Sequence, residues 1–345
     1  MTTMAPFGSW KSPITSALLT SSGIGFSEVR FSNGQVYWLE SRPDEGGRVV
    51  VVRCRPDGAP ADLIPPGFNT RTRAHEYGGG AYFIHNNILF FSNFKDQRLY
   101  RQDGSGEPRA ITPEPPRLGS LRYADGRVTN DGRTIICVRE RHEESREAIN
   151  EIVAMPAEGV GDAVVLLEGY DFYSFPRMSP DGKRLAWTCW RHPQMPWDGT
   201  ELWAGDLSGS GPSSTVSNAR RIAGSTTESI FQPEWAPDGT LHFISDRTGW
   251  WNLYREQSAG VMPVFQIDAE IGIPQWLFGY SRYAFLSGGR IACIVGKSAL
   301  EYLAVADQRR RNIERPVIAH TAFGSITTDG NETVFFAAGS PANAA

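Results

Sequence analysis

Short apolar stretches alternate with polar turns along most of this chain. One turn recurs almost unchanged at Ser179–Gly182, Ala236–Gly239 and Thr327–Gly330, and its last two residues are Asp-Gly each time. An apolar stretch of strand length follows each copy, as in KRLAWTCW, TLHFIS and ETVFFAA. Asp-Gly supplies the positive φ angles of a tight hairpin turn, so the pattern predicts antiparallel strands joined by hairpins. Helical periodicity is nearly absent, and even NEIVAM (150–155) is better interpreted as a strand.

The recurring turn has a period. With looser copies included, the second turn residue falls at seven positions, which are Gly34, Asn87, Gly132, Gly182, Gly239, Gly289 and Gly330. Successive positions are 53, 45, 50, 57, 50 and 41 residues apart. A polar loop, a third strand and a fourth strand follow each of the first six hairpins, as at Val264–Asp268 and Arg315–Ala319 for two of the fourth strands. This is the organisation of propeller blades. We therefore expect an all-β fold, a β-propeller of about seven four-stranded blades, six of them complete; unrelated hairpins in an open sandwich are the less regular alternative.

The last repeat contains two strands, Phe323–Thr328 and Glu332–Ala338, and GSPANAA follows them. Two strands without outer partners would leave an open sheet edge, which invites association. Either the N-terminal segment Ile14–Thr20 completes this blade or the natural chain continues, and we favour continuation. The expected organisation is an N-terminal extension over residues 1–25 and a propeller over residues 26–345, incomplete in its last blade.

Composition narrows the functional classes. The formal net charge of −4 over 345 residues makes binding to nucleic acid through phosphate contacts a poor explanation. The basic run Arg309–Arg311 is expected to be a solvated hairpin tip. The four cysteines are widely spaced and form no CxxC pair, which favours free thiols in a reducing compartment. The N-terminus shows no apolar signal sequence and no stretch is long enough to span a membrane, so we expect a soluble cytoplasmic protein without membrane partners.

Several longer motifs are more specific than the turn. They are FGSWKSPIT (7–15), RAHEYGGGAY (73–82), SNFKDQRLY (92–100) and SDRTGWWNLY (245–254). In this order, and together with the PDG turns, they resemble the N-terminal β-propeller of prolyl oligopeptidase-family serine peptidases, in particular the dipeptidyl aminopeptidase and acylaminoacyl-peptidase relatives. The turn alone is weaker, because TolB-like propellers share it.

The resemblance implies a role in peptide hydrolysis. Members of this family join such a propeller to an α/β-hydrolase domain with a Ser, an Asp and a His, and the propeller filters substrates by size. This chain departs from that pattern, because the nucleophile motif G-x-S-x-G is absent. The nearest string, Gly279–Tyr283, lacks the closing Gly and is expected to be structural. We therefore expect no catalytic residues and no α/β-hydrolase domain in this chain, and a hydrolase domain, in the same polypeptide or as a split chain, as its partner.

Two other functions stay open. A stand-alone TolB-like propeller would bind proteins or peptides without hydrolysis. A propeller glycosidase would need paired carboxylates on innermost strands, and the strands considered offer Glu28 and Glu234 alone, so this explanation ranks last. No cofactor is expected, and no metal site, because the six histidines show no ligand spacing.

The long polar and aromatic loops should gather on one face. In an up-and-down blade the connections alternate between two faces, which places 69–80, 139–147, 189–199 and 245–251 together, opposite the Asp-Gly turns. Binding residues tend to lie on loops that a rigid scaffold holds. We expect this face to meet the hydrolase domain and to line the substrate chamber.

The candidate substrate-binding residues on these loops fall into three groups, and each group has a structural alternative. His75, Glu76 and Tyr77 precede a glycine run, and Glu76 could bind a peptide's amino group, although an Arg–Glu pair with a buried Tyr is the plainer interpretation. Glu143 and Glu144 are a carboxylate pair suited to an ammonium, although a solvated ion-pair loop explains them equally simply.

Trp250 and Trp251, together with Trp190 and Trp197, could form an apolar wall for substrate or for a partner domain. Packing between blades is the alternative for at least two of the four.

Overall fold

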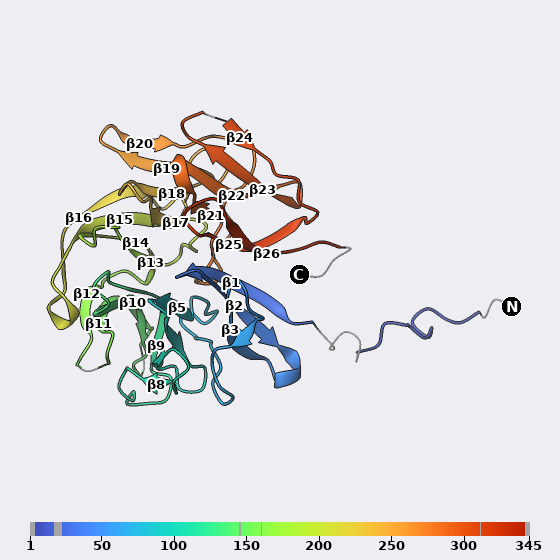
Figure 1. Ribbon diagram of the computed structural model, residues 1–345, viewed down its shortest axis with the longest axis horizontal. Helices are drawn as coiled ribbons and strands as arrows, with labels where there is room; N and C mark the ends of the chain where they lie inside the picture. Colours follow the sequence, from blue (N-terminus) through green and yellow to red (C-terminus); the bar gives the residue numbers. More distant parts are fainter. Residues whose placement is uncertain (1–3, 17–22, 145, 160, 311, 342–345) are drawn as a thin grey trace.

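The computed structural model describes residues 4–16, 23–144, 146–159, 161–310 and 312–341. Its strands form a β-propeller, in which antiparallel sheets are arranged radially around one axis (Figure 1). Six sheets have four strands and one has two, and within each sheet the strands follow chain order. Three 3-10 turns, η1 (Pro43–Glu45), η2 (Gly211–Ser213) and η3 (Ser287–Gly289), lie between the strands. The prediction of an all-β propeller with six complete blades and a shorter seventh is confirmed, and the described residues contain no α/β-hydrolase domain.

The strands of the first three blades are β1 (Gly25–Ser32), β2 (Gln35–Arg42), β3 (Arg48–Cys54) and β4 (Ala61–Asp62); β5 (Tyr82–His85), β6 (Ile88–Ser92), β7 (Leu99–Asp103) and β8 (Arg109–Ala110); and β9 (Leu121–Val128), β10 (Thr134–Arg141), β11 (Ile149–Pro156) and β12 (Val164–Leu167). Blades four and five are β13 (Phe172–Met178), β14 (Arg184–Trp190), β15 (Glu201–Ser208) and β16 (Thr215–Gly224); and β17 (Ile230–Trp235), β18 (Leu241–Ser245), β19 (Asn252–Gln257) and β20 (Gly260–Pro263). Blade six is β21 (Tyr283–Phe285), β22 (Arg290–Lys297), β23 (Leu300–Asp307) and β24 (Asn312–Glu314), and the two-stranded sheet is β25 (Ala322–Thr328) and β26 (Val334–Gly339).

Alternation along the strands gives each blade two apolar faces that pack on its neighbours. Phe83 and Phe90 of the second blade, for example, share a buried cluster with Tyr123, Ile135 and Cys137 of the third. Similar clusters lie at five other junctions, from blades one and two to blade six and the two-stranded sheet, so the core is a series of inter-blade layers. Burial of this apolar surface is the main force that holds the blades together.

The innermost strands repeat one irregularity, a β-bulge. The register shifts in β1, β9, β13, β17 and β25. In four of these strands the bulge holds a residue at positive φ, which is Glu28 (49°), Asp125 (54°), Phe175 (51°) or Gln232 (46°). A bulge turns a side chain out of the normal alternation. Three of these four side chains form hydrogen bonds with the next blade, and the Phe175 ring packs on Phe231 of the next blade.

The three polar bulge side chains accept hydrogen bonds from backbone N–H groups in, or just before, the inner strand of the next blade. Glu28 Oε1 accepts from Gly80 N at 2.8 Å, Asp125 Oδ2 accepts from Phe175 N at 2.8 Å, and Gln232 Oε1 accepts from Arg282 N at 2.6 Å. These bonds satisfy backbone donors at the crowded centre, where neighbouring strands converge but do not pair.

The two-stranded sheet closes the ring against the first blade. Glu28 N donates to Ser325 Oγ at 3.1 Å, and the Phe31 and Phe335 rings stack with centroids 5.2 Å apart. Strand β26 pairs with β25, and no other described strand pairs with it. The segment 14–20, considered above as a completing strand, runs into residues 17–22, which lie outside the described residues.

Two expected fourth strands are displaced. Val264–Asp268 follows β20 instead of forming it, because the Asn252 side chain takes over the pairing there: its Nδ2 donates to Ile267 O at 3.0 Å and its Oδ1 accepts from Ile267 N at 2.9 Å. Arg315–Ala319 likewise follows β24. NEIVAM lies in a strand, β11, as expected.

Three smaller expectations concern thiols, charge and membrane spans. All four cysteines are free, and burial raises the pKa of the Cys137, Cys189 and Cys293 thiols. Arg309 and Arg310 are exposed in the turn between β23 and β24, while Arg311 lies outside the described residues. Among the residues that the structure describes, no helix has the length and apolar character needed to cross a membrane.

Candidate functional site

The long loops meet on one face, as their alternation predicts. Loops 69–80, 139–147 and 189–199 line a single cavity of about 610 Å³ together with the segment Gln275–Phe278. The loop 245–251 adjoins them, because Ser229 Oγ donates to Pro196 O at 2.9 Å while Ser229 N donates to Asp246 Oδ1 at 2.8 Å. On the opposite side the hairpin turns contact one another, as when Asn130 Nδ2 donates to Pro180 O at 2.7 Å. We call the cavity the loop-face pocket.

A left-handed turn builds one wall of the loop-face pocket. His75 and Glu76 have φ angles of 53° and 65°, and Gly78, Gly79 and Gly80 are also positive. A Cβ on Gly79 would lie 2.2 Å from Phe278 O, closer than any real contact. The glycine run therefore lets this turn lie directly against the Phe278 backbone, which is the close approach that the sequence suggested.

Glu140 is the buried anchor of this turn. Its side chain is 3% exposed and accepts from His75 N at 2.7 Å, from Arg122 Nη1 at 3.0 Å and from His142 Nε2 at 2.6 Å when that nitrogen carries the proton. Arg122 Nη1 also donates to Glu76 Oε1 at 2.7 Å. The Arg–Glu pair expected as the structural alternative for Glu76 is therefore present, yet the Glu76 side chain stays 72% exposed at the mouth of the pocket.

The His75 ring lies among three aromatic rings, with centroids 5.1 Å from Phe172, 5.6 Å from Trp190 and 4.5 Å from Phe278. Burial lowers the pKa of His75 to about 3, against a smaller opposing contribution from Asn150. At neutral pH the ring is uncharged, and it serves as part of the apolar floor of the pocket.

An exposed aromatic wall rises beside this floor. The Tyr77 ring lies 5.3 Å from Trp276, and Trp276 lies 4.4 Å from Trp197. Tyr77 is 60% exposed and Trp276 is 46% exposed, so both rings offer large apolar faces to solvent. Tyr77 is thus not the buried residue of the structural alternative. Exposed aromatic clusters of this kind are typical of binding surfaces.

The polar lining of the pocket is acidic. Glu76, Glu140, Glu147 and Asp171 line it, against one lining arginine, Arg146. The buried acceptors Asn150 Oδ1 and Gln275 Oε1 also line it, and neither has a hydrogen-bond partner among the described residues. The pocket thus combines aromatic surface, negative charge and free acceptors, a set that suits a cationic or N–H-bearing ligand.

The other candidate residues lie outside the loop-face pocket. Glu143 forms ion pairs with Arg141 and Arg146, the arrangement of its structural alternative, and Glu144 is exposed. Trp251 packs against Gly272 and, together with Pro274, lines a cavity that is separate from the loop-face pocket. Trp250 is 38% exposed beside Leu300. The structure brings His75, Glu76 and Tyr77 together with Trp190 and Trp197, but not with Glu143, Glu144, Trp250 or Trp251.

Sequence reasoning missed the segment Gln275–Phe278. It supplies Trp276 to the wall and Phe278 to the floor, but it belongs to no strand and no repeated turn. The string PQWLFGY, aromatic residues directly after a proline, was the available signal.

One group in the described residues has the geometry of a metal site. Ligand atoms of Glu76, Glu140 and His142 lie within 4.8 Å of one another. Arg122 already donates to both carboxylates, so a cation would compete with a guanidinium held by short hydrogen bonds. These residues fit an ion poorly.

Ser281, in the string closest to a nucleophile motif, has a structural role. Its Oγ donates to Ile326 O at 2.7 Å and accepts from Gln232 Nε2 at 3.3 Å, which links blades five, six and seven.

Solved structures identify relatives of this fold. A Mycobacterium tuberculosis puromycin-hydrolyzing peptidase is 32% identical with a TM-score of 0.89, over 98% of this chain and 53% of the peptidase. A crystal structure of puromycin hydrolase gives 32% identity and a TM-score of 0.89, over 99% of this chain and 54% of the hydrolase. The chain matches the propeller portion of these peptidases. It spans about half of their length.

More distant propellers share the fold alone. Prolyl oligopeptidase B from Galerina marginata, bound to a 25mer macrocyclization substrate, is 11% identical with a TM-score of 0.64, over 92% of this chain and 47% of that protein. An oligogalacturonate lyase in complex with manganese is 14% identical with a TM-score of 0.60, over 82% of this chain and 73% of the lyase. No protein-family model and no curated protein matches the chain.

Proposed function

We propose that this chain is the substrate-admitting, non-catalytic propeller part of a prolyl oligopeptidase-type serine peptidase. The main support for this proposal is the 32% sequence identity, over nearly the whole chain, to the propeller portion of puromycin-hydrolysing peptidases. The chain contains no G-x-S-x-G motif, so its partner in hydrolysis would be an α/β-hydrolase domain, in the same polypeptide or as a separate chain.

The face with the long loops is the proposed contact surface for that domain. Tyr77 and Trp276 expose apolar rings on it, and aromatic residues of this kind dominate the energetics of protein contacts. Substrate would then be enclosed between the two parts, and the compact ring of blades would admit peptides but not folded proteins. This is the size filter that the sequence resemblance implies.

Peptide binding in the loop-face pocket would use two kinds of contact. The carboxylates of Glu76 and Glu147 would attract an amino-terminal ammonium, as expected for dipeptidyl-type activity, whereas an acylaminoacyl-type substrate would lack that charge. The Tyr77, Trp276 and Trp197 rings would bind an apolar side chain, and the free acceptors Asn150 Oδ1 and Gln275 Oε1 would accept from peptide N–H groups.

Titration of the chain with the peptide Phe-Ala-Ala tests this role through tryptophan fluorescence. W276A should weaken binding about tenfold, because it removes a major apolar contact of order 1.4 kcal/mol. E76Q should weaken binding of the free-amine peptide but not of its N-acetyl form. W10A is the control, since Trp10 is exposed in the N-terminal segment away from the blades (Figure 1). Equal affinity of W276A, E76Q and wild type for the peptide would reject the pocket.

Turnover tests the non-catalytic assignment. The purified chain should release no p-nitroaniline from aminoacyl- or acylaminoacyl-p-nitroanilides. Turnover that a serine-directed inhibitor abolishes would show that the chain carries a nucleophile of its own. Peptide binding without any hydrolase partner in the cell would instead favour the second candidate, a stand-alone peptide-binding propeller.

A further inference from the structure

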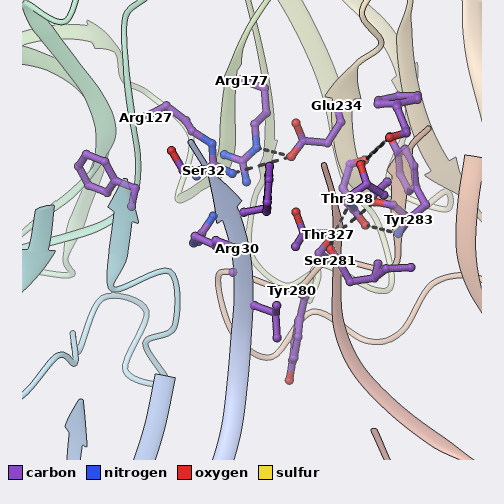
Figure 2. Close-up of a pocket in the computed structure, with 18 of the residues that line it drawn as sticks. Arg30, Ser32, Arg127, Arg177, Glu234, Tyr280, Ser281, Tyr283, Thr327 and Thr328 are labelled. Atoms are coloured by element: carbon purple, nitrogen blue, oxygen red, sulfur yellow. Dashed lines mark hydrogen bonds and ion pairs between the residues drawn. The ribbon is translucent and has the colours of Figure 1, made fainter. Parts of the chain in front are cut away.

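The axis of the propeller holds a second cavity, distinct from the loop-face pocket. It has a volume of about 320 Å³, and all seven innermost strands contribute to its lining. Its lining runs toward the hairpin-turn side of each strand, as with Ser32 before the turn at Gly34 and Thr328 before the turn at Gly330. We call it the channel pocket (Figure 2).

Three arginines converge on the channel pocket, from β1, β9 and β13. Figure 2 shows Arg30, Arg127 and Arg177 directed into the same space, with Glu234 of β17 opposite them. Such a concentration of guanidinium groups is unusual in a small cavity, because each charge loses solvation there and needs a partner.

Arg177 is paired with two carboxylates. Its Nε donates to Glu234 Oε1 at 2.8 Å, and its Nη2 lies 2.9 Å from Asp125 Oδ1. The Asp125 side chain is 1% exposed, and the guanidinium of Arg177 holds the pKa of this carboxyl below its ordinary value although burial acts in the opposite direction. The Arg177–Asp125 ion pair therefore joins blades three and four and has a structural role.

Arg127, in contrast, has no carboxylate partner of its own in the part of the chain that the structure describes. Its one hydrogen bond among the described residues goes to the carbonyl of the adjacent Gly126, at 3.0 Å. The nearest carboxylate oxygens are at 4.0 Å on Asp125 and 3.9 Å on Glu234, and both of these groups already bind Arg177. Burial, and then repulsion from Arg177 and Arg30, lowers the pKa of Arg127 to about 9. Glu234 and Asp125 oppose this shift, but neither carboxylate forms a hydrogen bond with the Arg127 guanidinium, which is therefore incompletely paired.

Arg30 offers a further free donor. Its Nη2 reaches Glu28 Oε2 at 3.3 Å, but its buried Nε has no partner among the described residues. Hydroxyls of Ser32, Thr327 and Tyr280 line the same cavity. Burial raises the pKa of Tyr280, so its phenol stays protonated and can donate. Unused donors thus surround the centre of the pocket.

We infer that the channel pocket binds a carboxylate group, with Arg127 and Arg30 as its principal donors. Arginine binds planar oxyanions well because its N–H groups form a fork. Glu234, 3.9 Å from Arg127, favours a singly charged carboxylate over a doubly charged phosphate through repulsion. The apolar rings of Phe31, Phe83 and Trp235 leave room for a small organic body attached to that carboxylate.

Two sources share this chemistry, the free C-terminus of a short peptide and a small carboxylic acid. The inference follows from the incompletely paired guanidinium groups of the channel and does not rest on the proposed peptidase role. If the ligand is a peptide C-terminus, the channel pocket would complement that role. It would bind the carboxylate end of a fragment whose other end lies in the chamber on the loop face.

Calorimetry on the full chain at low salt tests the site. N-acetyl-Ala-Ala-Ala, its C-terminal amide and succinate are the probes; the acetyl group removes the ammonium that the loop-face pocket would attract. The free-acid peptide should bind at least tenfold more tightly than the amide, and R127Q should lose at least tenfold in affinity for it. R309Q, which removes an exposed arginine in the turn after β23, should bind like wild type.

The probes separate the possible ligands. Binding of succinate as tightly as the free-acid peptide identifies a general carboxylate site, and binding of the peptide acid alone identifies a C-terminus site. The inference is overturned if no carboxylate probe binds wild type, if the amide binds like the acid, or if R127Q binds like wild type in a fold that circular dichroism shows intact. W276A should leave this binding unchanged, so failure of the loop-face pocket and failure of the channel pocket give different results.

Discussion

His75 shows how burial of one residue makes stability depend on pH. Its pKa is about 3 in the folded chain and ordinarily about 6.5 in an unfolded one. As pH falls through 6.5, the unfolded chain binds a proton at His75 that the folded chain does not bind. The contribution of His75 to the free energy of unfolding is therefore complete above pH 6.5 and decreases down to about pH 3.

Replacement of His75 by Phe should remove that dependence. Wild type should lose about 2 kcal/mol of unfolding free energy between pH 7 and pH 5 through His75, at about 1.36 kcal/mol per pH unit below 6.5. Urea unfolding at both pH values measures it. His242, whose pKa burial lowers to about 4, contributes equally to both proteins, so the difference between them isolates His75. An equal loss in H75F and wild type would contradict the neutral, buried ring.

Gly79 and Gly239 separate backbone strain from steric contact, because both have a φ of 83°. A Cβ at Gly79 would lie 2.2 Å from Phe278 O, whereas none of the neighbouring heavy atoms lies within 4 Å of a Cβ at Gly239. Gly239→Ala should cost about 1 kcal/mol for the left-handed backbone. Gly79→Ala should cost about 3 kcal/mol, since the turn must also move off Phe278. Denaturant midpoints give both values, and similar costs would refute the close approach.

At the scale of elements, the repeated bulge matters more than any single strand. It places Glu28, Asp125 and Gln232 where each can bond the backbone of the next blade. Inner strands of neighbouring blades do not pair as a sheet, so these side chains replace the missing ladder. Truncation of one of these side chains should weaken the contact between two blades and leave the strands themselves in place.

Asp125→Ala should destabilise the chain by about 3–5 kcal/mol, because Arg177 and Phe175 N lose a buried acceptor. Glu158→Ala is the matched control. Glu158 also contacts two arginines, Arg101 at 2.7 Å and Arg109 at 2.9 Å, but it is 67% exposed and its loss should cost about 1 kcal/mol or less. Thermal unfolding monitored by circular dichroism compares them, and equal costs would place Asp125 outside the structural core.

The sequence predicts the hairpins well and the bulges poorly. Asp-Gly at a turn indicates a strand on each side, and this was enough to number the blades. The same dipeptide at Asp125-Gly126 lies inside strand β9, where Asp125 is a bulge residue. Sequence reasoning missed Asp125 and Arg127, which lie on the inner strand of the third blade. Local pattern does not distinguish a turn from a bulge, because both need a positive φ.

The candidate site was predictable only where its residues belong to a sequence motif. His75, Glu76 and Tyr77 belong to a motif and lie in the loop-face pocket. Trp276, which contacts both Tyr77 and Trp197, comes from a segment outside the repeat. Contacts between irregular segments depend on how seven blades close into a ring, and periodicity does not contain that information.

At the scale of the whole molecule, the ring closes on a sheet of two strands. Blade one meets β25 through Glu28 N and Ser325 Oγ, and Phe31 stacks on Phe335 of β26. An apolar groove lies along this junction, lined by Phe26, Val36 and Trp38 of blade one and by Phe335. All six residues of β26 are half-buried, whereas β22 at the middle of blade six has five buried residues. The junction should therefore be the least stable inter-blade contact.

Hydrogen exchange measured by mass spectrometry tests this order of stability. Peptides covering β26 should exchange before peptides covering β22, since β26 bonds a strand on one side and β22 on both. Exchange should not depend on protein concentration if the edge is free. Protection of β26 that rises with concentration would show that a second copy adds a strand to the edge, as open edges permit. Protection equal to that of β22 at every concentration would contradict the order, because the closing sheet would then be as stable as a complete blade.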